Sequence, residues 1–174
     1  MSTKISTGRV RFSYANVFEP TAMDETQEKK YNISILIPKS DKATLAKVNA
    51  AIEAATAAGL ASKFGGKKPA TLRTPLRDGD IEKPEDDTYA GHYFINAKSN
   101  RKPQIVDANL DPIMSQDEFY SGCYGRASIT FYAYATAGSK GIAAGLENLQ
   151  KLADGERLGG GSSSAAEDFG DDLM

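Results

Sequence analysis

The sequence predicts a mainly β protein with one or two helices, folded as an OB-fold-like β-barrel and followed by a disordered acidic tail. Three observations support this prediction. Segments in which apolar and polar residues alternate with the period of a strand occur along most of residues 1–158. One prominent segment has helical spacing, and it lies between the early and the late strands. Residues 159–174 combine a Gly/Ser run with acids.

Length and composition limit the class of protein. A chain of 174 residues is long enough for one domain with a sizeable core, which we expect at residues 1–158, plus a linker and tail at 159–174. The 40% hydrophobic and 25% charged residues are typical of a soluble globular protein. No apolar run approaches the ~18 to 20 residues of a membrane span, and residues 1–9 lack the apolar segment of a signal peptide.

Two alternating segments begin the chain. Between residues 4 and 14, we expect a strand with Val10, Phe12 and Tyr14 on one face, the apolar one, and Arg9, Arg11 and Ser13 on the other. A second strand is expected at residues 31–37, where isoleucines alternate with polar residues up to Pro38. The polar residues 19–30 between them are expected to form a hairpin connection.

Helical signals occur in two places. Ser40 is expected to cap the first helix, in which Asp41 suits the positive N-terminal end. The apolar stripe of this helix consists of Leu45, Val48, Ile52 and Ala55. A shorter helix is predicted through Leu146, Leu149 and Leu152.

Three further strands are predicted at residues 91–99, 104–107 and 122–136, with a turn region at 138–141. Two long connections remain, at residues 66–90 and 109–121. The first of these is basic in its first half and acidic in its second, and a connection of this length in a compact domain is usually functional or mobile.

The longest predicted strand carries the strongest candidate for binding chemistry. One face collects polar and aromatic residues: Tyr124, Arg126, Ser128, Thr130, Tyr132 and Tyr134. The other face collects small or apolar ones: Cys123, Gly125, Ala127, Ile129, Phe131 and Ala133. Unpaired bases stack on exposed aromatic rings for ~1 to 3 kcal/mol each, while arginine and lysine neutralise phosphates. The alternative is that the tyrosines close a half-buried sheet with their hydroxyls at its rim.

Basic residues near strand ends and in loops extend this candidate surface. They form three clusters: Arg9 with Arg11; Lys98 with Arg101 and Lys102; and Lys67 and Lys68 with Arg73 and Arg77. Each cluster alone is typical of a solvated face, but three of them favour a nucleic-acid-binding surface.

The sequence offers few residues that could form a metal or catalytic site. Asp107, Asn109, Asp111 and Glu118 match four EF-hand ligand positions, but Pro112 stands where that loop needs glycine. Asp78, Asp80 and Glu82 are an alternative site for a hard cation, although an exposed acidic loop explains them as well. Cys123 and His92 are the only cysteine and histidine, which argues against a disulfide, a zinc cluster or a Cys/His catalytic pair. No catalytic residue, metal or cofactor is predicted.

Several strings resemble bacteriophage single-stranded DNA-binding proteins. They are LRTPLRDGD at 72–80, YAGHYFINA at 89–97, EFYSGCYGRA at 118–127, FYAY at 131–134 and KGIAAGL at 140–146. The resemblance runs from the first strand to about Gly155, and it implies an OB-fold body with an acidic C-terminal tail. The single cysteine fits a reducing compartment, so we expect the protein in the cytoplasm of the bacterial host. The predicted DNA-binding residues are Arg9, Arg11, Arg73, Arg77, Tyr93, Lys98, Arg101, Lys102, Tyr124, Arg126, Tyr132 and Tyr134.

The charge is unevenly divided. Residues 159–174 hold four acids and no base, giving −4, whereas residues 1–158 hold 21 bases and 19 acids, giving +2. Apolar residues among the acids are what a docking peptide needs, so we predict partner contacts by Glu167, Asp168, Phe169, Asp171, Asp172 and Leu173. The tail resembles those of replication single-strand-binding proteins but ends in Leu173-Met174 instead of phenylalanine. A tail that serves solubility alone is the alternative.

The sequence therefore predicts a non-enzymatic protein that coats and protects single-stranded DNA without strong sequence preference in phage DNA replication, recombination or repair. The tail is expected to compete with DNA and to recruit replication or recombination proteins. Duplex DNA is a further candidate partner, no membrane contact is expected, and the protein is expected to be a monomer or small homo-oligomer. The alternatives are a metal-dependent nuclease or junction-processing enzyme that uses the acidic loop, and a protein–protein adaptor.

Overall fold

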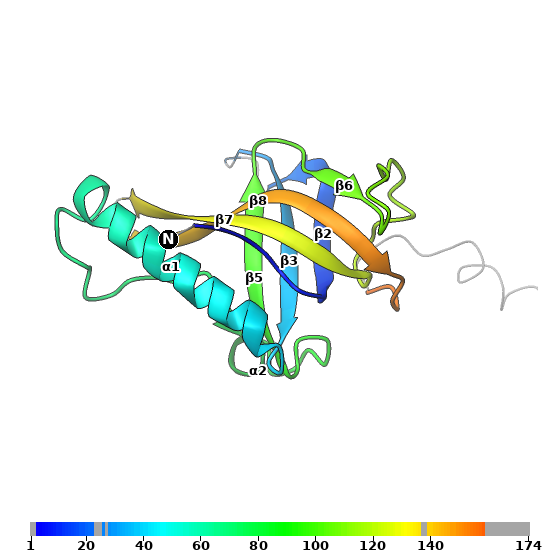
Figure 1. Cartoon of the computed structure of the whole chain (residues 1–174), viewed down its shortest axis with the longest axis horizontal. Coiled ribbons are helices and arrows are strands. Elements are labelled where there is room, and N and C mark those ends of the chain that lie inside the picture. The colour runs from blue at the N-terminus through cyan, green and yellow to red at the C-terminus, as the bar shows by residue number, and fades with distance from the viewer. Residues whose placement is uncertain (1–2, 23–25, 27, 137–138, 159–174) are drawn as a thin grey trace, which may run out of the picture.

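A computed structural model of the chain describes residues 3–22, 26, 28–136 and 139–158, which form eight strands and two helices (Figure 1). The strands are β1 (Lys4–Ser6), β2 (Val10–Thr21), β3 (Lys30–Pro38), β4 (Leu76–Asp78), β5 (His92–Ser99), β6 (Gln104–Val106), β7 (Tyr124–Thr136) and β8 (Ser139–Ala153). The helices are α1 (Lys42–Ser62) and α2 (Gly79–Glu82). The predicted class, mainly β with one or two helices, is confirmed.

Five strands close into a ring. In the sheet β7 pairs with β2, β2 with β3, β3 with β5 and β5 with β8, and β8 pairs again with β7. The pairs are antiparallel except for β5–β8, which is parallel. The short strands β1, β4 and β6 add to β7, β5 and β8 respectively. A closed five-stranded ring of this kind is the OB-fold-like barrel that the sequence predicted.

The first predicted strand is in fact two strands. Thr7 interrupts it, because its buried side chain hydrogen-bonds backbone at the point where the chain passes from β1 to β2. Thr7 Oγ1 accepts a hydrogen bond from Ala127 N (3.0 Å) and donates one to Gly8 O (2.8 Å). Gly8 N in turn donates to Thr44 Oγ1 on α1 (2.9 Å), which ties the junction to the helix.

The predicted helix through Leu146 and Leu149 is wrong, because these residues lie in β8. Ser128 pairs with Asn148 and Ile129 with Leu146, so a bulge at this point shifts the register of the β7–β8 pair. A bulge adds one residue to one strand, and leucines three positions apart can then both point inward. Leu146 and Leu149 are buried, and their spacing imitates a helix, whereas Leu152 is 37% exposed.

The long helix begins one residue later than predicted. Asp41, not Ser40, is the N-cap, and its carboxylate accepts hydrogen bonds from Thr44 N (3.1 Å) and Thr44 Oγ1 (2.6 Å). The predicted apolar stripe is buried. Figure 1 shows α1 running alongside β7, and at this contact Gly59 faces Ala133. Neither helix of the described chain is long and apolar enough to cross a membrane.

The main core lies inside the ring and under α1. The predicted apolar face of β7 supplies Ala127, Ile129 and Phe131 to it, all buried. Cys123 is also buried, and its burial raises the pKa of the thiol. A second, smaller cluster consists of Leu36, Tyr89 and Phe94 and lies on the outer side of β3 and β5.

The contact between α1 and β7 predicts an unusual response to a glycine substitution. Gly59→Ala adds a methyl group that overlaps Ala133 Cβ, so we expect it to lower the free energy of unfolding by about 1 to 3 kcal/mol. Helix propensity alone would predict the opposite sign, a gain of about 1 kcal/mol. Urea unfolding measures the difference, with Ala58→Gly on the exposed side of the same turn as a control. A more stable Gly59→Ala variant would contradict the close packing.

Candidate nucleic-acid interface

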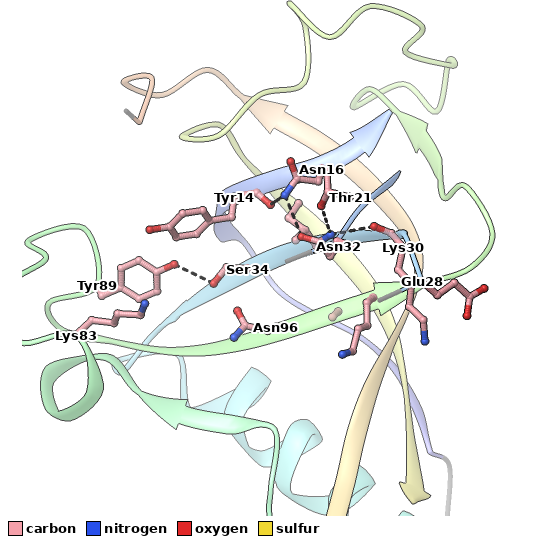
Figure 2. A pocket seen from close by; sticks show the side chains of 14 residues that line it. Tyr14, Asn16, Thr21, Glu28, Lys30, Asn32, Ser34, Lys83, Tyr89 and Asn96 are labelled. Atoms are coloured by element: carbon pink, nitrogen blue, oxygen red, sulfur yellow. Dashed lines mark hydrogen bonds between the residues drawn. The ribbon is translucent and has the colours of Figure 1, made fainter. Parts of the chain in front are cut away.

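A groove crosses the outer wall of the barrel over β2, β3 and β5 (Figure 2). It encloses about 740 Å³. The polar and aromatic side chains that line it are Tyr14, Asn16, Thr21, Glu28, Lys30, Asn32, Ser34, Lys83, Tyr89, Asn96 and Lys98.

Strand alternation explains why the floor of this groove is polar. Ile33, Ile35 and Ile95 point into the core, so the residues between them point outward. The register places Ser34 opposite Asn96 and Asn32 opposite Lys98, which brings four polar residues side by side. The outer wall therefore carries hydrogen-bonding groups where the inner wall carries isoleucines.

The groove is positively charged and has unused hydrogen-bonding capacity. Among the described residues, Lys30, Lys83 and Lys98 line it together with one acid, Glu28. The side chain of Asn96 is exposed, and within the described part of the chain its amide has no hydrogen-bond partner. Ammonium groups can neutralise phosphates, and a free amide can donate to and accept from the edge of a base.

The loop that follows α2 closes one end of the groove. Tyr89 is 1% exposed, packs edge-on against Phe94 with ring centroids 5.0 Å apart, and donates a hydrogen bond to Ser34 Oγ (3.0 Å). The ammonium group of Lys83 lies 5.7 Å from the centroid of the Tyr89 ring. This loop is therefore packed onto the barrel wall, with Lys83 held at the groove.

An ion cluster holds the base of the same loop. Lys39 Nζ lies 2.8 Å from Asp78 Oδ1 and 2.7 Å from Asp80 Oδ2, and Gly91 N donates to Asp80 Oδ1 (3.0 Å). The hydrogen bond from Lys39, followed by that from Gly91, lowers the pKa of the Asp80 carboxyl. The carboxylates of Asp78 and Asp80 thus already have a cationic partner.

The alternative of a hard-cation site in this acidic loop finds no ligand cluster. Glu82 Oε1 lies 2.6 Å from Arg77 Nη1, directed to a guanidinium group instead of to the other two acids. Across the described ranges, no group of three or more His, Cys, Asp or Glu side chains is placed to hold a metal ion.

Three of the predicted residues meet where β2 and β7 pair. The guanidinium carbons of Arg9 and Arg11 lie 5.0 and 5.3 Å from the centroid of the Tyr124 ring. Arg11 Nε also donates to Gly122 O (3.0 Å) and its Nη2 to Glu156 O (2.8 Å). Arg126, nearby on β7, donates from Nε to Thr7 O (2.8 Å). We call Arg9, Arg11 and Tyr124 the Tyr124 cluster.

Other predicted residues lie farther along the hairpin of β7 and β8. Tyr134 is ten positions from Tyr124, roughly 33 Å in an extended strand. Tyr132 is 45% exposed and Tyr134 is half-buried, so neither ring is packed inward. Arg73 lies at this end of the hairpin, because its backbone bridges to Gly141, the partner of Tyr134.

The remaining predicted residues have other partners. Arg101 Nη2 lies 3.4 Å from Glu147 Oε2, Lys102 lies over the ring of Phe18 at 5.4 Å, and Arg77 pairs with Glu82. Tyr93 packs against the main core, with Lys39 Nζ 5.1 Å from its ring centroid. Among the predicted DNA-binding residues, all of which are described, Lys98 is the one that lines the groove.

Sequence reasoning therefore missed most of the groove. Its strongest error is Tyr14, which strict alternation placed on the apolar face with Val10 and Phe12, whereas the structure leaves it 59% exposed. The polar face of β3, with Asn32 and Ser34, was visible in the sequence. Its partner, the loop that carries Lys83 and Tyr89, could not be placed on that face from spacing alone.

The predicted docking residues of the tail lie outside the described residues, but the point from which the tail leaves is described. Leu158 N donates to Ser121 O (3.0 Å), and Ser121 Oγ accepts a hydrogen bond from Ala15 N (2.9 Å). Ala15 follows Tyr14 in β2. Leu158, the last described residue, is therefore linked through Ser121 to the part of β2 whose Tyr14 and Asn16 line the groove.

Comparison with known proteins identifies relatives along nearly the whole chain. The family described as "Enterobacter phage Enc34, ssDNA-binding protein" matches residues 3–174. Protein p50 of Acyrthosiphon pisum secondary endosymbiont phage 1 is 34% identical over 178 residues, which cover 97% of this chain and 93% of that protein.

Solved structures show the same architecture. The single-stranded DNA-binding protein of bacteriophage Enc34, solved in complex with ssDNA, superposes with a TM-score of 0.80 at 26% identity, covering 90% of each chain. The single-stranded DNA-binding protein gp2.5 of bacteriophage T7 superposes with a TM-score of 0.62 over 95% of this chain and 93% of its own. At 15% identity, the second likeness concerns the fold alone.

The Tyr124 cluster predicts different roles for its two neighbouring arginines. Arg11→Ala removes two hydrogen bonds to backbone carbonyls, so we expect a loss of about 1 to 3 kcal/mol in the free energy of unfolding. Arg9 is exposed, and its contact is the Tyr124 ring, so Arg9→Ala should change stability by less than about 0.5 kcal/mol. Thermal and urea unfolding of both variants provide the measurement. Equal losses would show that Arg11 is no more structural than Arg9.

Proposed function

The chain belongs to the family of the single-stranded DNA-binding protein of Enterobacter phage Enc34, and we propose that it likewise binds and coats single-stranded DNA without strong sequence preference. The observation that carries the proposal is the groove over β2, β3 and β5, which combines an exposed tyrosine with three lysines on the outer wall of an OB-fold-like barrel. OB-fold barrels bind oligonucleotides on the face of their second and third strands, which here are β3 and β5.

Each part of the groove has a role in this proposal. Lys30, Lys83 and Lys98 bind phosphates, and every base can stack on the ring of Tyr14 because every base has a π face. The amide of Asn96 forms hydrogen bonds with base edges as the strand passes. None of these contacts requires one base in particular, which accounts for the expected tolerance of sequence.

The predicted residues outside the groove form a second contact region in the proposal. The strand β2 is shared, because Tyr14 and Asn16 line the groove while Arg11 pairs with Tyr124. A bound strand can therefore continue from the groove to Arg9, Arg11, Tyr124 and Arg126. A longer strand would reach the outlying predicted residues: Arg73, Arg77, Tyr93, Arg101, Lys102, Tyr132 and Tyr134.

The acidic tail is proposed to compete with DNA for this surface and to dock onto replication or recombination proteins when DNA displaces it. The charges of −4 and +2 on tail and body support the competition. Geometry supports it as well, since Leu158 N donates to Ser121 O and Ser121 Oγ accepts from Ala15 N, and Ala15 stands in β2 between the groove residues Tyr14 and Asn16. The six linker residues 159–164 can span up to about 20 Å, which gives the acids that follow them a wide reach from Leu158.

Salt dependence tests the phosphate contacts. With the three groove lysines engaged, the affinity for oligo-dT should fall roughly 20-fold between about 50 and 200 mM salt, because binding releases counterions. Fluorescence anisotropy of labelled single-stranded and duplex oligonucleotides measures it. An affinity that barely changes with salt would contradict the mechanism.

Lys98→Ala should make the slope of log affinity against log salt shallower by ~0.7, the amount expected for one phosphate contact on a single strand. Lys42→Ala is the matched control, because Lys42 is also exposed but lies on α1, outside the groove. The same loss in both variants would mean that net charge, and not the groove, governs binding.

Removal of residues 159–174 tests the tail. The truncated protein should bind oligo-dT several-fold more tightly at low salt, with the gain vanishing at high salt, because a screened tail no longer competes. Duplex binding should increase as well. Titration of the full-length and truncated proteins side by side, with the detached tail peptide added back in trans, measures the effect. Unchanged affinity after truncation would argue against self-competition.

A further inference from the structure

We infer that Tyr14 is the base-stacking platform of the groove and that the barrel holds its backbone in a strained conformation to keep the ring there. This inference rests on the proposed function and adds a residue-level device to it. It is built on four observations: a bulge in β2, a positive φ angle, a hydrogen-bonded anchor, and the position of the ring.

The bulge reverses the direction of one side chain. Ser13 pairs with Ser34 and Asn16 with Asn32, so Tyr14 and Ala15 together oppose Ile33 alone. A two-against-one bulge of this kind turns one side chain to the other side of the sheet. Tyr14 should have joined Val10 and Phe12 in the core by alternation, and the bulge places it outside instead.

The backbone at this position is strained. Tyr14 has a φ of 47°, in the left-handed region that a bulky L-residue rarely adopts. Among the described non-glycine residues, one other has a positive φ: Leu110, at 69°. Leu110 lies in a tight turn that its own N–H closes onto Asp107 O (3.0 Å), whereas Tyr14 lies within a twelve-residue strand. Strain inside a strand is maintained only if the surroundings fix it, and it is often found at functional sites.

A chain of amides fixes the strained residue. Asn16 Nδ2 donates to Tyr14 O (3.2 Å) and to Asn32 Oδ1 (3.0 Å). Asn32 Nδ2 then donates to Thr21 Oγ1 and Lys30 O, both at 2.9 Å, which ties the bulge to β3. On the other side, Ala15 N donates to Ser121 Oγ. Asn16 and Asn32 are therefore positioning residues for the Tyr14 ring.

The ring stands where a base would enter. Figure 2 shows Tyr14, from β2, and Tyr89, from the loop after α2, reaching the same end of the pocket. Tyr89 is buried, with its ring packed against Phe94 and its hydroxyl hydrogen-bonded to Ser34, whereas Tyr14 is 59% exposed. Of the aromatic residues that line the described pocket, Tyr14 is the one with a ring surface left for a ligand.

Binding to two kinds of strand provides the test. The probes are oligo-dT and an abasic oligonucleotide of equal length, which has the same phosphates but no bases. Tyr14→Ala and Tyr14→Gly should lose about tenfold or more in affinity for oligo-dT and nothing for the abasic strand, while Tyr14→Phe keeps both affinities. Leu110→Gly is the matched control, a second strained and exposed residue outside the groove, and it should bind as the unaltered protein does.

The two variants that lose affinity alike should differ in stability. Tyr14→Gly should unfold at a higher urea concentration than Tyr14→Ala, because glycine alone is free of strain at this φ. At Tyr132, in regular extended backbone, the order should reverse, with the glycine variant less stable than the alanine variant. Asn16→Ala should weaken oligo-dT binding in the unaltered background and not in the Tyr14→Ala background, since it acts through the ring.

The outcomes separate the two proposals. If the unaltered protein binds oligo-dT and Tyr14→Gly binds it equally well, the inference fails and the proposed function stands. An equal loss on the base-bearing and abasic strands would also overturn stacking, because the ring would then act on the backbone path. If the unaltered protein binds neither strand, the proposed function fails and the inference fails with it.

Discussion

Closure of the five-stranded ring governs where every other side chain of the barrel can point. Once β8 pairs with both β5 and β7, every ring strand must direct one side inward, and that side has to be apolar. The isoleucines of β3 and the alternating small and large residues of β7 meet this demand. The outer side is then free of core packing, and its composition can serve a ligand.

The outer wall of β3 and β5 has an apolar part and a polar part. Over one end of β3 and β5, Leu36 and Phe94 are apolar, and Tyr89 buries them from outside. Leu36, Phe94 and Tyr89 form an apolar plug. Beyond this plug the wall is polar, with Ser34, Asn32 and Asn96, and it stays open as the groove. The plug therefore serves both the fold and the site, because the loop that supplies Tyr89 also brings Lys83 to the groove.

The charged residues divide in the same way. Lys39 and Arg77 are paired with acids, and Arg11 is bonded to two carbonyl groups, so these cations stabilise loops and chain crossings. Lys30, Lys83 and Lys98 line the groove, and in the described part of the chain Glu28 is the one acid that lines it with them. A cluster of basic residues in the sequence does not reveal this distinction. A lysine or arginine that is held by an acid or a carbonyl group looks the same in the sequence as one that is available to a ligand.

The fold class, the apolar stripe of α1, the inward side of β7 and the resemblance to phage single-stranded DNA-binding proteins could all be predicted from the sequence, since they depend on local periodicity or on contiguous strings. The bulges could not be predicted in this way. One made Leu146 and Leu149 look helical, and the other moved Tyr14 from the core to the surface. A bulge is a mismatch between two paired strands, so it has no signature in either strand alone, and only the tertiary pairing decides which side its residue faces. The groove depended on the same information, because β2, β3, β5 and the loop after α2 meet only when the ring is closed.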